Sequence, residues 1–193
     1  MLTRLVDTID RRLRSRLHIT EFSNSPDCLF RLQIIENDEA FALEDGTLLQ
    51  PGDRLADLHF WNEHVPIVPI DGPTLAFARR IERCLDLSLS EIARYLAAHA
   101  DLGDIKAVRG NMSLGSSGRS EQIARIALKY GFERVSRRKP LSFGDALHQF
   151  GENILITLLV MRRNPSAIRI DTLWRDRTLT YLSRQTLERR YNH

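Results

Sequence analysis

The segment from 58 to 64 carries the first side chains that could do chemistry; it reads Leu58-His59-Phe60-Trp61-Asn62-Glu63-His64. In an extended strand side chains alternate, so His59, Trp61 and Glu63 share one face. The strand end would present an imidazole, an indole, an amide and a carboxylate to a ligand, with His59 and Glu63 as an acid–base pair. In the alternative interpretation Asn62 and Glu63 satisfy backbone groups where the strand turns, and His59 hydrogen-bonds within the fold.

The same segment also holds metal-ligand types, but their spacing argues against a metal. His59, Glu63 and His64 fall within six residues and match no standard ligand spacing. His59 and His64 would also point to opposite faces of an extended strand. We therefore predict no metal site.

A second candidate is the segment from 109 to 120, rich in Gly, Ser and Arg, which links a predicted strand to a predicted helix. Backbone N–H groups at a helix N-terminus favour a phosphate or carboxylate, and a guanidinium adds a fork of donors. The candidate anion ligands are Arg109, Ser113, Ser116, Ser117 and Arg119. The segment is neither a Walker loop nor a dinucleotide fingerprint, because the Gly-Lys-Ser/Thr and the glycine spacing are absent. A well-capped loop without a ligand is the alternative.

Other catalytic patterns are absent from the sequence. Gly-x-Ser-x-Gly does not occur, and Cys84 lies on the apolar side of a predicted helix, as a packed thiol would. No basic stripe is interleaved with aromatic residues, so there is no sequence-specific nucleic-acid signature. These patterns identify no catalytic residue and no cofactor.

Composition limits the class of protein. The 193 residues suffice for one buried core, and we expect a single domain over residues 1–193. The net charge is +3, and 25 of the 28 basic residues are Arg, which suits anionic partners such as phosphates and carboxylates. The alternative is a solvated Arg-rich surface. No apolar run approaches the roughly 20 residues of a membrane span, and the two cysteines fit a soluble protein of the cytoplasm.

Periodicity predicts the elements that position these segments. Residues 1–22 form an amphipathic helix, residues 28–35 a strand with Arg31 and Gln33 on its polar face, and Asp45-Gly46 a hairpin turn before a strand from 54 to 61. These strands make an acidic meander. Pro73 begins a helix with the apolar stripe Leu75, Ala78, Ile81 and Leu85, and a capping box of Ser88 and Glu91 begins another.

The second half of the chain follows the same logic. The expected elements are a strand at 105–108, a helix at 121–130 ended by Gly131, a strand at 132–136, a long central core helix at 143–161, a hairpin of 167–174 with 177–182, and a short helix capped by Ser183. The fold class is therefore α+β, with a mostly antiparallel sheet covered by helices.

Two resemblances bear on function. Gly52-Asp53-Arg54-Leu55, the 58–63 block and Tyr130-Gly131-Phe132-Glu133 resemble the YkoP-like family, a bacterial domain found alone or joined to polysaccharide deacetylase domains. The resemblance covers residues 30–135 and continues more faintly to the C-terminal hairpin. It implies a setting in envelope glycan or glycolipid metabolism, without assigned catalytic residues. Gly131-Phe132 after a Gly-rich loop is also similar to acetyl-coenzyme A acyltransferases, although the pyrophosphate loop departs from their pattern.

Three hypotheses of function follow. In the leading one the protein binds an anionic metabolite or lipid-linked sugar precursor, with His59, Asn62 and Glu63 on its polar part and the 109–120 loop on its phosphate or carboxylate. In the second it is an acyl- or glycosyltransferase with His59 or Glu63 as general base. In the third its Arg-rich N-terminal helix docks a partner or an anionic membrane surface.

Overall fold

The computed structural model describes residues 19–61, 63–67, 69–72, 74–111, 126–135 and 179–192. The chain divides into two compact units, one of residues 1–110 with 181–193 and the other of residues 111–180. The long helix expected at 143–161, the first hairpin strand at 167–174 and the N-terminal helix up to residue 18 lie outside the described residues.

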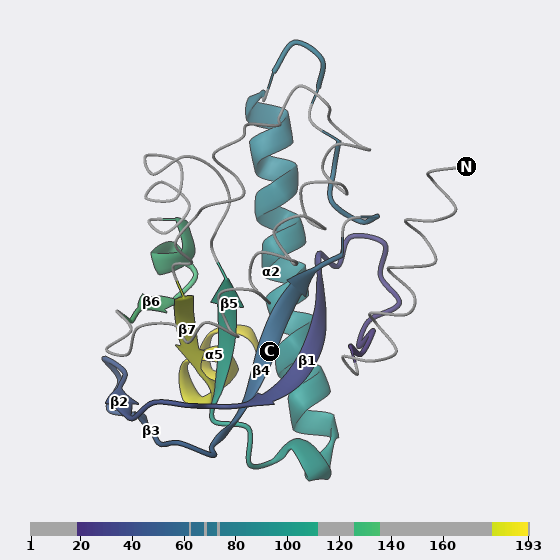
Figure 1. The fold of residues 1–193 in the computed structure, drawn as a ribbon. Coiled ribbons are helices and arrows are strands. Elements are labelled where there is room, and N and C mark those ends of the chain that lie inside the picture. Colours follow the sequence, from purple (N-terminus) through teal and green to yellow (C-terminus); the bar gives the residue numbers. More distant parts are fainter. Residues whose placement is uncertain are drawn as a thin grey trace, which may run out of the picture. The chain divides into compact units, whose positions relative to one another are not determined.

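Within the described residues, seven short strands form two sheets (Figure 1). The strands are β1 (Phe30–Glu36), β2 (Phe41–Ala42), β3 (Leu48–Leu49), β4 (Arg54–Phe60), β5 (Ala107–Asn111), β6 (Glu133–Arg134) and β7 (Leu179–Ser183). The larger sheet has the order β1-β4-β5-β7-β6, and β2 pairs with β3 in a sheet of two. The strands predicted at 28–35, 54–61, 105–108 and 132–136 and the hairpin at Asp45-Gly46 are confirmed.

The expected meander is wrong in its connections. The β2–β3 hairpin forms its own sheet, and β1 pairs directly with β4 in antiparallel register, Phe30 opposite Phe60 and Glu36 opposite Arg54. The next pair is parallel, with Leu55 of β4 opposite Ala107 of β5. A parallel pair needs a long crossover, and the helix between these two strands supplies it. The class is α+β, with both kinds of pairing in the larger sheet.

The crossover helix α2 (Leu75–Ala98) is one helix where the sequence predicts two. Its N-cap is Thr74, whose hydroxyl accepts a hydrogen bond from the Phe77 N–H at 3.2 Å. Ser88, the predicted cap, lies buried in mid-helix, where its hydroxyl donates to the Cys84 carbonyl (2.6 Å) and accepts from the Leu29 N–H (2.8 Å). No Gly or Pro interrupts the helix. The Ser88 hydroxyl therefore bonds the backbone at Leu29 instead of capping a new helix.

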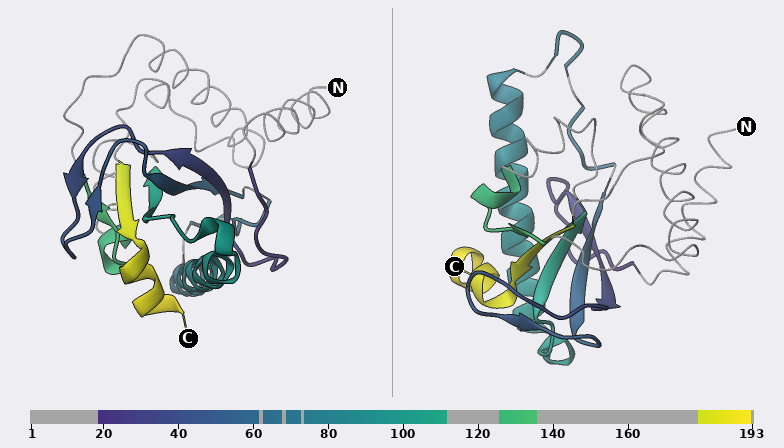
Figure 2. Two further views of the ribbon diagram at one scale, coloured as in Figure 1. Left: turned by 90° about the horizontal axis from the view of Figure 1, so that it is seen from below. Right: turned by 60° about the vertical axis from the view of Figure 1, so that its left-hand side comes forward.

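Apart from Cys84, which is 2% exposed, the buried residues of α2 lie in its second half. Leu89, Ile92, Ala93 and Leu96 are almost fully buried, and the helix runs alongside β1, β4 and β5 (Figures 1 and 2). By contrast, the predicted apolar stripe of the first half is wrong. Leu75 is 70% exposed, Ala78 is exposed, and Ile81 and Leu85 are only half-buried. The amphipathic pattern therefore continues beyond the length of helix that the sheet can bury.

The helix predicted for residues 1–22 does not extend to residue 22, because the described residues 19–22 are not helical. Thr20 forms an antiparallel bridge with Leu32, with N–O distances of 2.7 and 3.0 Å between the two backbones. Among the described strands β1 lies at the edge of the sheet, where backbone N–H and C=O groups can pair with such a passing segment. The helical boundary predicted at residue 22 is therefore wrong.

Two predicted helix ends are confirmed, one in each unit. In the first, the Ser183 hydroxyl accepts from the Thr186 N–H at 3.0 Å and caps α5 (Arg184–Tyr191). In the second, Gly131 has a φ of 90°, and the Phe132 N–H bonds the Ala127 carbonyl at 3.0 Å. That closure needs a left-handed residue, which glycine adopts without a Cβ penalty.

Candidate functional site

Five polar side chains gather on one face of the sheet in the first unit. In the β1–β4 pair Arg31 lies opposite His59 and Gln33 opposite Asp57, and in the β4–β5 pair Asp57 lies opposite Arg109. Residues paired in register project to the same side of a sheet. We call these five residues the polar row: Arg31, Gln33, Asp57, His59 and Arg109.

Asp57 joins the polar row together. Its Oδ1 lies 2.6 Å from the Nε of Arg109, and its Oδ2 lies 3.4 Å from the Nε2 of His59. That Nε2 also lies 3.0 Å from the Oε1 of Gln33. Asp57 is buried and His59 keeps 31% of its side chain exposed, so the carboxylate is the covered centre and the imidazole the accessible edge.

Sequence reasoning missed Asp57, although a signal for it exists. It is the one charged residue inside the run Leu55-Ala56-Asp57-Leu58, and it stands two residues before His59. In a strand that spacing places both side chains on one face. An acidic residue inside an apolar strand has to find a partner when it is buried.

The ion pair with Asp57 affects the pKa of Arg109. Burial alone would lower the pKa of this guanidinium, but the hydrogen bond and charge of Asp57 outweigh burial and leave the pKa raised. An arginine side chain stays protonated in proteins, so Arg109 is a permanent cation. Its side chain is 20% exposed, and within the part of the chain that the structure describes its Nη atoms make no hydrogen bond.

Arg31 is the most buried basic group of the polar row. It lies on the face predicted for it, but it is only 6% exposed instead of solvated. Its Nη2 lies 3.1 Å from Glu21 and 3.6 Å from Glu63, and its Cζ lies 4.5 Å from the centre of the Trp61 ring. Carboxylates and an aromatic face replace the water that a buried guanidinium loses.

The structure brings part of the predicted site together. His59 and Arg109 share Asp57, and Glu63 reaches Arg31, the register partner of His59. Arg109, predicted to begin the Gly/Ser loop, lies within β5 and meets Asp57, which is 52 positions earlier in the chain. The remaining predicted ligands lie outside the described residues: Asn62, Ser113, Ser116, Ser117 and Arg119.

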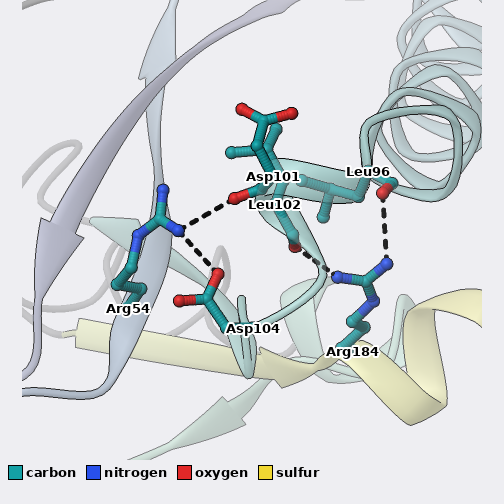
Figure 3. Close-up of polar contacts among 6 residues, drawn as sticks. All are labelled: Arg54, Leu96, Asp101, Leu102, Asp104 and Arg184. Atoms are coloured by element: carbon teal, nitrogen blue, oxygen red, sulfur yellow. Dashed lines mark hydrogen bonds and ion pairs between the residues drawn. The ribbon is translucent and has the colours of Figure 1, made fainter.

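A second arginine network lies elsewhere in the same unit (Figure 3). Arg184 donates to the main-chain carbonyls of Leu102 (2.6 Å) and Leu96 (3.1 Å), and its Nε bonds Glu188 at 2.7 Å. These bonds satisfy orphan carbonyls at the end of α2 and at the short 3₁₀ helix of Ala100–Leu102. The bonds of Arg184 hold segments of the fold together, so we assign this network a structural role. The candidate functional site is the polar row.

The described residues contain no group of three or more His, Cys, Asp or Glu side chains that could hold a metal ion. Among them there is also no helix long and apolar enough to cross a membrane. A family model described as the YkoP domain matches residues 1–191. No curated protein and no solved structure matches the chain.

Proposed function

The chain belongs to the YkoP domain family, and from that premise we propose that it binds an anionic metabolite or lipid-linked sugar precursor at the polar row. The observation that carries the proposal is Asp57, which holds an accessible imidazole and a permanent cation on one sheet face. The Nη groups of Arg109 offer two parallel donors, the geometry that phosphate and carboxylate oxygens accept.

The neighbouring groups suit the polar part of such a ligand. Glu63 keeps 52% of its side chain exposed, and His59 is accessible beside it on the same strand end. A carboxylate accepts hydrogen bonds from hydroxyl groups, and an imidazole both accepts and donates them. The ligand we propose therefore combines an anionic group with hydroxyl groups. We also propose that the protein binds this ligand in the cytoplasm.

A second candidate function is acyl or glycosyl transfer with His59 as general base. The specific observation in its favour is the 3.4 Å approach of Asp57 to the Nε2 of His59, because a carboxylate that orients an imidazole helps it to take up a proton. For the third hypothesis, docking through the N-terminal helix, the relevant residues up to 18 lie outside the described residues.

Thermal-shift titrations test the proposal. The probes are inorganic phosphate, N-acetylglucosamine 1-phosphate, a nucleotide sugar and acetyl-coenzyme A, each added to the full chain. A ligand of the native state raises the Tm in proportion to the logarithm of its concentration above Kd. We expect a rise with the sugar phosphate or nucleotide sugar, and a rise with acetyl-coenzyme A alone would favour the transferase.

The matched variants separate the site from general charge. The double substitution Asp57→Asn with Arg109→Gln removes the central ion pair without leaving a lone charge, and it should abolish the Tm rise. Arg94→Gln, on the exposed side of α2 beside Glu91, changes the net charge by one unit and should leave the rise intact. If the double variant responds like the wild type, the polar row is not the binding site.

A further inference from the structure

The segment that links β4 to α2 exposes large aliphatic side chains. Ile67 is 77% exposed, Ile70 is fully exposed, and Leu75, the first residue of α2, is 70% exposed. We call these three residues the apolar loop patch. We propose that this patch enters the surface of a bilayer that contains anionic lipids, so that the polar row meets a ligand anchored in that bilayer. The inference rests on the proposed function and narrows its ligand to a lipid-anchored one.

A turn holds the patch at the end of the helix. The Gly72 N–H donates to the Pro69 carbonyl at 2.9 Å, and Gly72 has a φ of 96°, which glycine adopts without a Cβ penalty. Ile70 follows Pro69 and is therefore at the corner of this turn. The turn extends beyond the N-terminal end of α2 (Figures 1 and 2). A side chain at such a corner can enter a lipid surface while the sheet stays in place.

The base of the same segment is fastened to the first unit. The His64 N–H donates to the Trp61 carbonyl at 2.9 Å, and the Nδ1 of His64 lies 2.9 Å from the Cys28 carbonyl oxygen. Pro66 is buried, and the exposed aliphatic side chains begin at the next residue. The segment is thus fixed at its base and exposed at its tip, as an anchoring loop requires.

Exposed arginines adjoin the apolar loop patch. Arg79 and Arg83 lie four and eight residues after Leu75, so the three side chains lie along one side of α2. Both arginines are exposed, whereas the acids of residues 65–83 are Asp71 and the half-buried Glu82. Cations beside an inserting apolar group strengthen its attachment to anionic lipids. The charges therefore favour an anionic bilayer as the occupant.

A second copy of the chain fits the patch less well. A stable protein interface buries about 800 Å² on each partner, which is far more than three aliphatic side chains expose. In a two-fold interface the same surface meets itself, which would bring Arg79 and Arg83 of both copies together. A bilayer needs only a few inserted aliphatic side chains with cations near them.

The polar row and the patch belong to the same edge of the sheet. Because β4 and β5 pair in parallel, their carboxyl ends share one edge. His59 is the last residue but one of β4, Arg109 is the third of five in β5, and the loop leaves β4 after Phe60. A lipid-anchored ligand can therefore present its headgroup to the polar row while the patch holds the protein at the surface.

Vesicle sedimentation of the full chain tests the contact. The vesicles are phosphatidylcholine with and without phosphatidylglycerol, at low and high salt. We expect binding to the anionic vesicles that weakens at high salt. The variant Ile67→Ser with Ile70→Ser and Leu75→Ser should bind about tenfold more weakly, because it removes the apolar area that inserts. Absence of wild-type binding, or equal binding of this variant, would overturn the inference.

The matched control removes three exposed aliphatic side chains elsewhere. Leu48, Ile126 and Leu128 are 60%, 51% and 49% exposed, and their joint replacement by Ser should leave vesicle binding unchanged. An equal loss in the control would mean that any exposed apolar side chain suffices, which contradicts a specific patch. Arg79→Gln with Arg83→Gln should weaken binding about tenfold at low salt and much less at high salt.

A nitroxide label locates the loop in a second, independent measurement. Cys28 and Cys84 are 0% and 2% exposed, so the label reacts with Ile70→Cys or with the control Leu48→Cys. When anionic vesicles are added, the access of a water-soluble nickel chelate to the label should fall at position 70 and stay the same at position 48. Unchanged access at position 70 would overturn the inference, even if the serine variant does not fold.

Phosphatidylinositol in place of phosphatidylglycerol tests the ligand class. The two lipids carry the same charge, and inositol adds a ring of hydroxyl groups. The wild type should bind phosphatidylinositol vesicles about five- to tenfold more tightly, and Asp57→Asn with Arg109→Gln should bind both kinds alike. Equal binding by the wild type would show that the polar row does not contact the headgroup.

A soluble probe separates this inference from the proposed function. The serine variant of the patch keeps the polar row, so it should bind N-acetylglucosamine 1-phosphate as the wild type does. If the wild type binds this probe but no vesicles, the membrane contact is wrong and the proposed function stands. If the patch binds vesicles but no probe of the polar row binds, the proposed function is wrong. A dimer in sedimentation velocity that the serine variant dissociates would assign the patch to a second copy instead.

Discussion

Two arginines of the first unit have almost the same burial but opposite kinds of partner. The side chains of Arg109 and Arg184 are 20% and 19% exposed. Arg109 bonds the side chain of Asp57, whereas Arg184 bonds the main-chain carbonyls of Leu96 and Leu102 in addition to the side chain of Glu188. A side-chain partner can be replaced by a ligand or by substitution, and a main-chain partner cannot. The type of acceptor, not burial, therefore distinguishes the candidate site from the fastening network.

Arg54 bonds both kinds of acceptor, a main-chain carbonyl and a side-chain carboxylate. Its Nη1 bonds the Asp101 carbonyl at 3.0 Å and the carboxylate of Asp104 at 2.6 Å (Figure 3). Both acceptors belong to the turn that follows α2, so the guanidinium ties the start of β4 to that turn. The side chain of Asp104 is 59% exposed, and an ion pair so close to water contributes little to stability.

The largest effect should come from removing the shared carboxylate. Asp57→Ala leaves the largely buried Arg109 without its counter-charge, and we expect the free energy of unfolding to fall by about 3 kcal/mol. Urea denaturation followed by circular dichroism measures the change. A loss below about 0.5 kcal/mol, the usual size for a surface substitution, would contradict the burial of this ion pair.

Rescue then tests the comparison directly. Asp57→Asn combined with Arg109→Gln removes both charges together, so we expect the double variant to recover most of the stability, to within about 1 kcal/mol of the wild type. If the double variant is no more stable than Asp57→Ala, the pair is not replaceable and the contrast with Arg184 disappears.

Arg184→Ala should have the next largest effect and should resist rescue. It withdraws donors from the carbonyls of Leu96 and Leu102, which we expect to cost about 2 kcal/mol in urea denaturation. Its control is Glu188→Gln, which changes only the half-exposed i,i+4 partner and should cost less than about 0.5 kcal/mol. Recovery of stability in the pair Arg184→Ala with Glu188→Gln would show that the main-chain bonds are unimportant.

Ser88→Ala should have a somewhat smaller effect. The substitution leaves the Leu29 N–H, whose residue is 2% exposed, without the hydroxyl that accepts its hydrogen bond, at an expected cost of about 1.5 kcal/mol. Ser90→Ala on the same helix is the matched control, and it should change stability by less than about 0.5 kcal/mol. Equal effects of the two substitutions would mean that the bond to Leu29 is not stabilising.

The smallest effect should be the contribution of Asp45, a neighbour of Ser183 and Thr186, to the pH dependence of stability. Burial tends to raise the pKa of Asp45, but hydrogen bonds from Ser183, Thr47 and Thr186 outweigh it and leave the pKa below its ordinary value of 3.8. The lowered pKa adds stability above pH 3.8, and this is lost as the pH falls through the native pKa. We expect Asp45→Asn to reduce the loss of unfolding free energy on acidification, measured by urea denaturation at several pH values, by less than about 1 kcal/mol. The same loss of unfolding free energy on acidification in Asp45→Asn and in the wild type would contradict this.

Local sequence patterns were sufficient to predict the turns and helix ends that depend on a few neighbouring residues. The turn at Asp45-Gly46, the cap at Ser183 and the helix end at Gly131 were all predicted correctly. Each depends on the backbone preferences of a few consecutive residues. Alternation also placed Arg31 on the correct face of its strand, and a short motif pointed to the family whose model matches residues 1–191.

Features that depend on distant segments required the fold. Ser88 has the sequence signal of a cap, but the buried N–H of Leu29 makes it an acceptor inside one long helix. Arg31 has the pattern of a solvated residue, but Glu21 and Trp61 enclose it. Asp57 and Arg109 are 52 positions apart and meet because β4 and β5 pair in parallel. Strand pairing over such a distance is set by packing of the whole sheet, which short-range preferences do not encode.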